Sequence, residues 1–267
     1  MGLTDLHSHV IPGVDDGAGS VEEACAALGA LRAAGVTTVV ATPHVQASLT
    51  RAPDALEARL AEVETGWRAL TEEVAPWVEG LTVLRGAELE LDTPDPDFSD
   101  PRLRLGGGPA VLVEFPNLAV PPNSQVVLGR IRAGGWTPVL AHPERYAGVG
   151  SIVGAVRAWR EAGALLQVNA GSLLGRYGAE ARRRAWALLE HGLADCIASD
   201  YHARGNVRLQ ELVAHLAEKG AGEQARLLTG INPARILAGE PPIPVGPLRL
   251  RRGALWARVV RLVRALR

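Results

Sequence analysis

The segment Asp5-Leu6-His7-Ser8-His9, followed by Val14-Asp15-Asp16-Gly17, is the part of the sequence that decides the fold. Alternate side chains of a β-strand point to the same face, so a strand here would present His7 and His9 on one side. The acidic turn that follows brings carboxylates within reach of both rings. Neutral imidazoles and carboxylates are ligands of divalent metal ions, so the segment predicts a strand that ends at a metal site.

Five more strand-like segments end in residues of the same chemistry. They are residues 36–41 before Thr42-Pro43-His44, 81–84 before Arg85-Gly86-Ala87-Glu88, 110–113 before Glu114-Phe115-Pro116, 137–141 before His142-Pro143-Glu144-Arg145-Tyr146, and 195–198 before Ser199-Asp200-Tyr201-His202. The two remaining histidines, His191 and His215, lie in helix-like segments, and we expect them to be structural or surface residues. Active sites of βα-barrels lie at the carboxyl ends of the strands, so this sorting predicts one shared site.

Strand-like and helix-like segments alternate along the first 240 residues. The expected strands are 3–9, 36–41, 81–88, 110–115, 136–141, 164–169 and 194–199, and the expected helices are 21–34, 53–74, 124–133, 152–162 and 179–191. Ser20 is a candidate N-cap of the first helix. Seven such units predict an α/β fold in which a parallel sheet closes into a barrel. We expect one domain over residues 1-240 and a separate tail over 241-267.

Composition excludes several classes of protein. The formal net charge of −1 provides no basic field for nucleic acid. Cys25 and Cys196 lack a CxxC partner, and the sixth residue after each is not Arg, which argues against disulfides, thiolate zinc sites and cysteine phosphatases. The first strand begins at once, leaving no room for a signal peptide, and no apolar run is as long as a membrane span. We therefore expect a cytoplasmic protein.

Together these motifs resemble the PHP (polymerase and histidinol phosphatase) superfamily over about residues 3 to 238, including Ile231-Asn232-Pro233-Ala234. Within it, V-D-D-G, H-P-E-R-Y and S-D-x-H are most similar to the bacterial manganese-dependent tyrosine-protein phosphatases of capsule and exopolysaccharide operons. The resemblance implies a distorted (βα)7 TIM-like barrel of the PHP type with a trinuclear metal centre. Its implied ligands are His7, His9, Asp16, His44, Glu88, Glu114, His142, Asp200 and His202, with Glu88 bridging. Its implied phosphate contacts are Arg145 and Arg208.

Several of these assignments have alternatives. The alternatives are Asp15 for Asp16, Glu90 for Glu88, and Arg204 for Arg208. Glu144 is either a site residue or a surface acid, and Tyr146 either packs under its loop or hydrogen-bonds near the site. Asn169 ends a predicted strand and is a candidate to line the pocket. Nitrogen and oxygen ligands suit manganese, iron, magnesium or zinc, of which the resemblance favours manganese.

The expected chemistry is hydrolysis of a phosphomonoester. This reaction needs charge neutralisation, an activated water and in-line geometry, which adjacent cations provide, so the expected nucleophile is a metal-bridging hydroxide. Arg145 would grip phosphate oxygens with its planar fork. The resemblance implies a protein-tyrosine phosphatase acting on phosphotyrosine, with the tail of a bacterial tyrosine kinase as substrate. The alternatives are a small-molecule phosphatase such as histidinol-phosphate phosphatase, an amidohydrolase-like enzyme, and a regulatory metal-binding scaffold.

Residues 241-267 differ from the rest in carrying seven Arg and no acidic residue. The Pro-rich stretch 241–247 predicts a stiff connector. Apolar residues then recur at helical spacing, with basic residues largely opposite: Leu255, Val259, Leu262, Val263 and Leu266 against Arg258, Arg261 and Arg264. Such a basic amphipathic helix either lies on an anionic membrane surface, here the inner face, or docks on its own barrel or a neighbouring subunit of a homo-oligomer.

Overall fold

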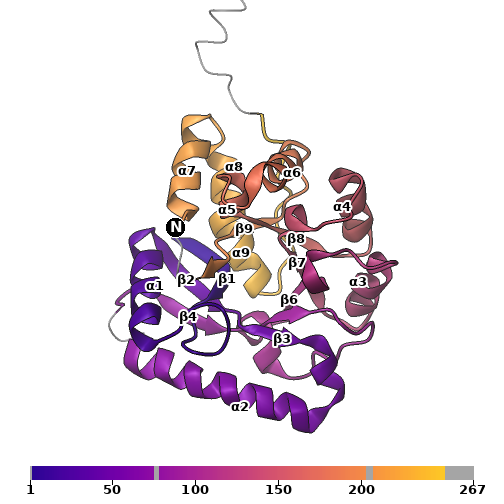
Figure 1. The fold of residues 1–267 in the computed structure, drawn as a ribbon. Coiled ribbons are helices and arrows are strands. Elements are labelled where there is room, and N and C mark those ends of the chain that lie inside the picture. The colour runs from indigo at the N-terminus through magenta and orange to yellow at the C-terminus, as the bar shows by residue number, and fades with distance from the viewer. Residues whose placement is uncertain (1, 75–77, 203–206, 250–267) are drawn as a thin grey trace, which may run out of the picture.

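The computed structural model describes residues 2–74, 78–202 and 207–249. Its strands pair in parallel into a four-stranded sheet, β10-β1-β2-β4, and a six-stranded sheet, β3-β5-β6-β7-β8-β9 (Figure 1). The strands are β1 (Leu3–His9), β2 (Val36–Ala41), β3 (His44–Gln46), β4 (Thr82–Arg85), β5 (Glu88–Glu90), β6 (Ala110–Glu114), β7 (Thr137–Ala141), β8 (Leu165–Asn169), β9 (Cys196–Ala198) and β10 (Tyr201–His202). The α/β fold with parallel sheets that the sequence predicted is confirmed.

Short breaks separate β2 from β3, β4 from β5, and β9 from β10, so the continuous strand predicted over 81–88 is wrong. Pro43 lacks the N–H that a continuous ladder would use at the first break. At the second, a Cβ on Gly86 would lie 3.1 Å from the Val40 side chain and 3.2 Å from the Leu105 side chain, so any other residue would have to displace these neighbours. At the third, Asp200 has a positive φ of 50°. Each break precedes a segment that enters the other sheet and carries a polar side chain.

Helices connect the strands and cover the outside of the sheets (Figure 1). They are α1 (Val21–Ala33), α2 (Pro53–Ala69), α3 (Ser124–Ala133), α4 (Ile152–Glu161), α5 (Ala170–Leu173), α6 (Gly178–Glu190), α7 (Leu209–Glu218), α8 (Gly222–Arg226) and α9 (Asn232–Leu237). The Ser20 side chain accepts a hydrogen bond from the Glu23 N–H, so the predicted N-cap is confirmed. Helix α2 is shorter than predicted, because a wider π-helical turn replaces its last residues over 70–74.

A cluster of three aromatic side chains supports the loop after β7. Phe115, Tyr146 and Trp159 are at most 2% exposed, and their ring centroids are 5.1 to 6.2 Å apart. Trp159 also donates a hydrogen bond from Nε1 to Ser124 Oγ, at 2.9 Å. Aromatic pairs of this kind each contribute about 0.5–1.5 kcal/mol beyond the area they bury. The loop that carries His142 therefore rests on a rigid base.

The stretch 241–249, which includes the predicted connector, contacts the body of the protein. The side-chain amide of Asn232 donates to the Ile243 carbonyl and accepts from the Ile243 N–H, both at 2.9 Å. Leu248 is buried, and its N–H donates to the Leu189 carbonyl at 2.9 Å. The predicted amphipathic helix lies outside the described residues. Within them, every helix is too short or too polar to cross a membrane.

Candidate metal centre

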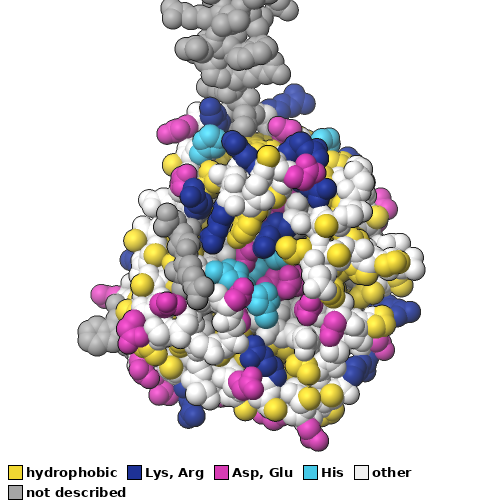
Figure 2. Space-filling model, viewed as in Figure 1, with side chains coloured by type: hydrophobic (Ala, Val, Ile, Leu, Met, Phe, Trp, Pro, Cys, Tyr) yellow, Lys and Arg dark blue, Asp and Glu magenta, His cyan; other side chains and the backbone are white. Residues whose placement is uncertain are grey.

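The structure brings all nine predicted ligands together, either at the carboxyl end of a strand or in the segment that directly follows one. Figure 2 shows histidines gathered with acidic side chains in the centre of one face. His7 and His9 end β1, Asp16 lies in the loop after β1, His44 begins β3, Glu88 begins β5, Glu114 ends β6, His142 follows β7, Asp200 precedes β10, and His202 ends β10. Their donor atoms form four overlapping groups, each with its members within 4.8 Å of one another.

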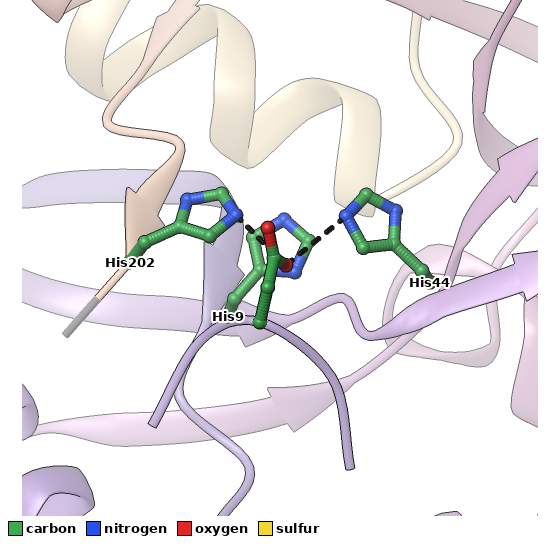
Figure 3. Close-up of side chains that lie close together, drawn as sticks. His9, His44 and His202 are labelled. Carbon is green, nitrogen blue, oxygen red and sulfur yellow. Dashed lines mark ion pairs between the residues drawn. The ribbon is translucent and has the colours of Figure 1, made fainter. Parts of the chain in front are cut away.

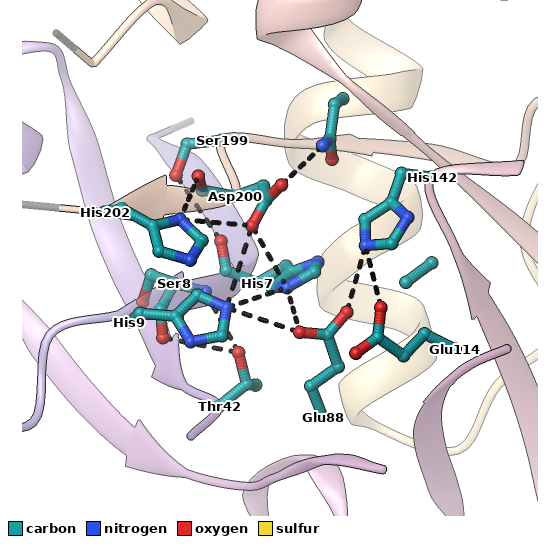
Figure 4. Close-up of polar contacts among 12 residues, drawn as sticks. His7, Ser8, His9, Thr42, Glu88, Glu114, His142, Ser199, Asp200 and His202 are labelled. Atoms are coloured by element: carbon teal, nitrogen blue, oxygen red, sulfur yellow. Dashed lines mark hydrogen bonds and ion pairs between the residues drawn. The ribbon is translucent and has the colours of Figure 1, made fainter. Parts of the chain in front are cut away.

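The most buried part of the cluster is built around His7 and His9 (Figure 4). Their Nε2 atoms are 3.2 Å apart. Glu88 Oε2 lies 3.1 Å from His7 Nε2 and 3.3 Å from His9 Nε2. Asp200 Oδ1 lies 3.4 and 3.6 Å from the same two nitrogens. Two imidazole nitrogens and two carboxylate oxygens thus point at one small space, which is an arrangement suited to a cation.

Glu88 joins this part of the cluster to its neighbours. Its Oε2 is also 3.2 Å from His44 Nδ1, and its Oε1 is 3.0 Å from His142 Nε2. Glu114 lies beyond, 3.4 Å from His44 Nδ1 and 3.7 Å from His142 Nε2. Glu90, the alternative to Glu88, is the in-register neighbour of Glu114 on the next strand. The donor groups found among the described residues include Glu88 but not Glu90.

The two acidic residues of the V-D-D-G turn have different partners. Asp16 Oδ1 lies 3.3 Å from His202 Nε2 and 3.5 Å from His44 Nε2 (Figure 3). Asp15 instead accepts from His9 Nδ1 at 2.8 Å and from the Gly17 N–H at 3.0 Å. A Cβ on Gly17 would lie 2.1 Å from the His9 carbonyl oxygen, so this tight turn requires glycine. The structure thus places Asp16 among the donors and Asp15 behind the His9 ring.

Two of the donors have a strained backbone. His142 and Asp200 have positive φ values of 33° and 50°, a region that residues other than glycine enter at a cost of about 1–3 kcal/mol. Surrounding contacts hold the second of these residues in place. The Asp200 N–H donates to the His7 carbonyl at 3.0 Å, and the Ser199 N–H donates to Asp5 Oδ1 at 2.9 Å. Strain of this kind is concentrated at functional sites.

The charges of the cluster are strongly coupled. Burial would lower the pKa of His7, but the charges of Glu88 and Asp200 outweigh it and raise the pKa to about 9. Burial would likewise raise the pKa of Glu88, yet the charge of His7 and a hydrogen bond from His142 hold it well below its usual range. The buried Glu88 carboxylate therefore stays ionised, and its negative charge favours a cation nearby. A thiolate-free set of nitrogen and oxygen donors fits a divalent ion such as manganese, iron, magnesium or zinc.

Comparison with known proteins agrees with this geometry. The family described as Capsular polysaccharide synthesis, CpsB/CapC, matches residues 3–238. The chain belongs to the CpsB/CapC family. It is similar to tyrosine-protein phosphatase YwqE of Bacillus subtilis, with 28% identity over 91% of this chain and 96% of YwqE. It is also similar to tyrosine-protein phosphatase CpsB of Streptococcus pneumoniae, with 29% identity over 88% of this chain and 98% of CpsB.

A solved structure supports the same relationship. It is described as one of the crystal structures of YwqE from Bacillus subtilis and CpsB from Streptococcus pneumoniae, unique metal-dependent tyrosine phosphatases. The match has a TM-score of 0.73 and 26% identity, and covers 92% of this chain and all of the solved chain. The resemblance predicted from the motifs is thus confirmed at the level of the CpsB/CapC family.

The predicted phosphate-contacting arginines of this CpsB/CapC chain have different surroundings. Arg145 Nη1 donates to Asp200 Oδ2 at 2.8 Å, and its guanidinium lies 4.2 Å from the ring centroid of Tyr177. Arg208 directly precedes α7 and forms an ion pair with Glu211 at 3.2 Å. Arg204, the alternative, lies outside the described residues. Arg145 is therefore attached to the donor cluster, and the role of Arg208 stays a prediction.

Polar residues behind the cluster add to what the sequence predicted. Glu144 is 1% exposed and accepts the Asn169 N–H at 3.0 Å, so its interpretation as a surface acid is wrong. The Tyr146 hydroxyl donates to the Ala141 carbonyl at 2.9 Å, which places it under the loop. Sequence reasoning assigned no role to Gln167 or to Asp5. For Gln167 a usable signal exists, because it interrupts the apolar run Leu165-Leu166-Gln167-Val168.

Proposed function

We propose that this chain is a metal-dependent protein-tyrosine phosphatase that hydrolyses phosphotyrosine and acts in capsular polysaccharide synthesis. One observation carries the proposal: nine nitrogen and oxygen donors converge on one face, with Arg145 attached to the donor Asp200. The relatives named tyrosine-protein phosphatases, which match nearly the whole chain, supply the substrate class. Divalent cations and a guanidinium both stabilise the negative charge of a phosphate ester during its hydrolysis, so the residues suit this reaction.

The distances between donor atoms support three metal positions. His7, His9 and Asp200 with Glu88 Oε2 would hold one ion, and His142 and Glu114 with Glu88 Oε1 would hold a second. Asp16, His44 and His202 would hold a third. Manganese is the ion we propose first. Divalent ions held there would lower the pKa of a bound water toward neutrality and neutralise phosphate oxygens.

The surroundings of the donors suit a phosphotyrosine side chain. A cavity of about 420 Å³ lies beside the cluster and is lined by His44, Val45, Gln46, Leu49, Arg59, Glu90 and Glu114. This volume is within the range of small-molecule sites, and its apolar members can contact a phenyl ring. Arg145, held by Asp200 and Tyr177, retains N–H groups for bidentate contact with phosphate oxygens.

Finer features belong to the same proposal. Both sheets are parallel throughout, and β10 pairs with β1, which supports our proposal of the distorted (βα)7 barrel over residues 1-240. We propose the phosphorylated tail of a bacterial tyrosine kinase as the substrate, in the cytoplasm. We propose that residues 241-267 form a tail whose first part, 241–249, contacts the barrel. The basic amphipathic pattern of the remainder suits contact with an anionic membrane surface or another subunit of a homo-oligomer.

The test is hydrolysis of a phosphotyrosine peptide compared with histidinol phosphate, with Mn²⁺ or with chelator, by wild type, His142→Ala and His191→Ala. We expect Mn²⁺-dependent turnover of the peptide that is lost in His142→Ala. His191 is exposed and lies outside the donor groups, so His191→Ala should retain wild-type turnover. Faster hydrolysis of histidinol phosphate than of the peptide would show that the enzyme acts on small molecules and would contradict a phosphotyrosine substrate. A metal-loaded protein without phosphatase activity would contradict the proposal as a whole.

A further inference from the structure

Two buried amide side chains lie directly behind the donor cluster. Gln167 and Asn169 are two residues apart on β8, so their side chains leave the strand on the same face, and both are 0% exposed. Neither has been given a role in the proposed reaction. A buried amide costs free energy unless its donors and acceptor find partners, so the contacts of these two residues are informative.

The two amides form a continuous chain of hydrogen bonds between two donors of the cluster. His7 Nδ1 lies 3.0 Å from Gln167 Oε1. Gln167 Nε2 donates to Asn169 Oδ1 at 2.7 Å, and Asn169 Nδ2 donates to Asp200 Oδ2 at 2.6 Å. His7 and Asp200 also face each other directly, since His7 Nε2 is 3.4 Å from Asp200 Oδ1. The amides therefore join His7 Nδ1 to Asp200 Oδ2, while the other ring nitrogen of His7 and the other carboxylate oxygen of Asp200 face each other in the cluster.

The direction of this chain is determined by its carboxylate end. An ionised carboxylate only accepts hydrogen bonds, so Asn169 must turn its NH₂ group to Asp200 and its oxygen to Gln167. Gln167 must then turn its NH₂ group to Asn169 and its oxygen to His7. The proton between His7 and Gln167 is consequently on His7 Nδ1. This assignment leaves His7 Nε2 as the atom that offers a lone pair to the cluster when the ring is neutral.

The same chain reaches the phosphate side of the site. Asp200 Oδ2 accepts from Arg145 Nη1 at 2.8 Å and from the Tyr177 hydroxyl at 3.4 Å, in addition to Asn169. These donors occupy Oδ2 and leave Oδ1 to face His7 and His9. The Asn169 N–H also donates to the buried carboxylate of Glu144, which ties the end of β8 to the loop that carries Arg145.

We propose that Gln167 and Asn169 are positioning residues that together set the tautomer of His7 and the orientation of the Asp200 carboxylate. The inference rests on the proposed function only in taking the donor cluster as a metal site. Groups that hydrogen-bond to metal ligands from behind typically change metal affinity by about 10- to 100-fold when removed. Because Gln167 and Asn169 belong to one chain of hydrogen bonds, replacing either amide should lower metal affinity by a similar factor.

The experiment measures Mn²⁺ binding to the full-length, metal-free protein by the loss of the free-Mn²⁺ electron paramagnetic resonance signal. We compare wild type, Gln167→Leu, Asn169→Leu and the double variant. Each single variant should weaken the tightest Mn²⁺ site about 10- to 100-fold. The double variant should bind Mn²⁺ no more weakly than the single variant that has the lower affinity. Additive losses in the double variant, or wild-type affinity in both single variants, would overturn the inference.

Asn232→Leu is the matched control. Asn232 is a buried amide like Gln167 and Asn169, but its side chain hydrogen-bonds to the backbone of the stretch 241–249 and not to the donor cluster. The unfolding midpoint of each metal-free variant is measured alongside. We expect Asn232→Leu to lower the unfolding midpoint while leaving Mn²⁺ affinity unchanged. If Asn232→Leu weakened Mn²⁺ binding as much as Gln167→Leu does, the loss in Gln167→Leu would be explained by general destabilisation and the inference would be overturned. If Gln167→Leu does not fold, Gln167→Met carries the same comparison. The affinity changes would support the inference even if the wild type proved inactive on phosphotyrosine.

Discussion

The donor cluster has a buried part and an exposed part, which differ in how their side chains are held. The deep group, His7, His9, Glu88, His142 and Asp200, is at most 2% exposed. The rim group consists of Glu114, His202, His44 and Asp16, whose side chains are 15%, 22%, 37% and 71% exposed. In the deep group, His7, His9 and Asp200 each have a second hydrogen-bond partner behind them, in Gln167, Asp15 and Asn169 respectively.

This difference has an energetic meaning. Deep donors are oriented before a cation arrives, so binding there does not require further ordering of side chains. Rim donors are hydrated, and attraction between exposed charges is weak and screened. We therefore expect the deep group to bind its ions tightly and the rim group to exchange its ion with solvent. The predictions below test this contrast, beginning with the largest expected effect.

Glu88→Gln should be the most damaging change to the deep group. It removes the negative charge that lies within 3.3 Å of His7, His9, His44 and His142. We expect kcat/KM on a phosphotyrosine peptide to fall by about 10³-fold or more, and added Mn²⁺ not to restore it. Steady-state kinetics over a series of Mn²⁺ concentrations is the measurement. Recovery at high Mn²⁺ would show that Glu88 behaves as a rim residue.

The deep group should also make the stability of the metal-free protein depend on pH. The pKa of His7 rises from 6.5 to about 9 in the folded protein, so the native state holds this proton more tightly than the unfolded chain. The stabilisation, about 3 kcal/mol, is fully present below pH 6.5 and is lost as the pH rises through about 9. Urea unfolding in chelator should show this loss in wild type and a shallower loss in His7→Gln. If the free energy of unfolding fell equally with pH in wild type and in His7→Gln, the prediction would be contradicted.

Arg145→Lys tests the arginine that is attached to the deep group. Lysine keeps the charge but cannot contact Asp200 and a phosphate with one planar fork. We expect kcat/KM to fall by about 100-fold, as for removal of a charge-stabilising donor, with unchanged Mn²⁺ affinity. Phosphatase assays combined with Mn²⁺ titration measure both quantities. Wild-type kinetics would show that the guanidinium does not contact phosphate.

Arg208→Ala should lower phosphatase turnover about tenfold, which corresponds to the loss of one charge-assisted hydrogen bond. Arg204→Ala should have little effect on turnover. Arg208 lies outside the deep group and pairs with Glu211, so its effect should be smaller than that of Arg145. Kinetics of the two alanine variants decides between the arginines. The reverse result would assign the phosphate contact to Arg204.

Asp16→Asn should be the mildest of these changes, because its side chain is the most exposed of the donors. We expect activity to fall about fivefold at limiting Mn²⁺ and to return at saturating Mn²⁺. Glu22→Gln, an exposed acid at the start of α1, is the matched control and should behave as wild type. A loss that excess Mn²⁺ does not restore would place Asp16 in the deep group.

The sequence predicted most strands to within two residues, because apolar runs and terminating glycines are local signals. It also predicted which side chains would meet, since parallel strands end on one side of their sheets. It missed the break between β4 and β5 and the short strands β3 and β10, since each depends on packing against other segments. Gly86, for example, is constrained by Val40 and by Leu105, residues that periodicity cannot relate to it.

The sequence by itself therefore located the candidate donors at the ends of predicted strands, because donor type and strand alternation are properties of single short segments. It left open the choice between Asp15 and Asp16 and that between Glu88 and Glu90. Only the tertiary structure decided the hydrogen bonds behind the donors, because these join residues far apart in the chain. His7 meets Gln167 across 160 residues, and Asp5 meets Ser199 across 194. A buried amide or carboxylate must find a partner, but which partner it finds depends on how the strands are packed.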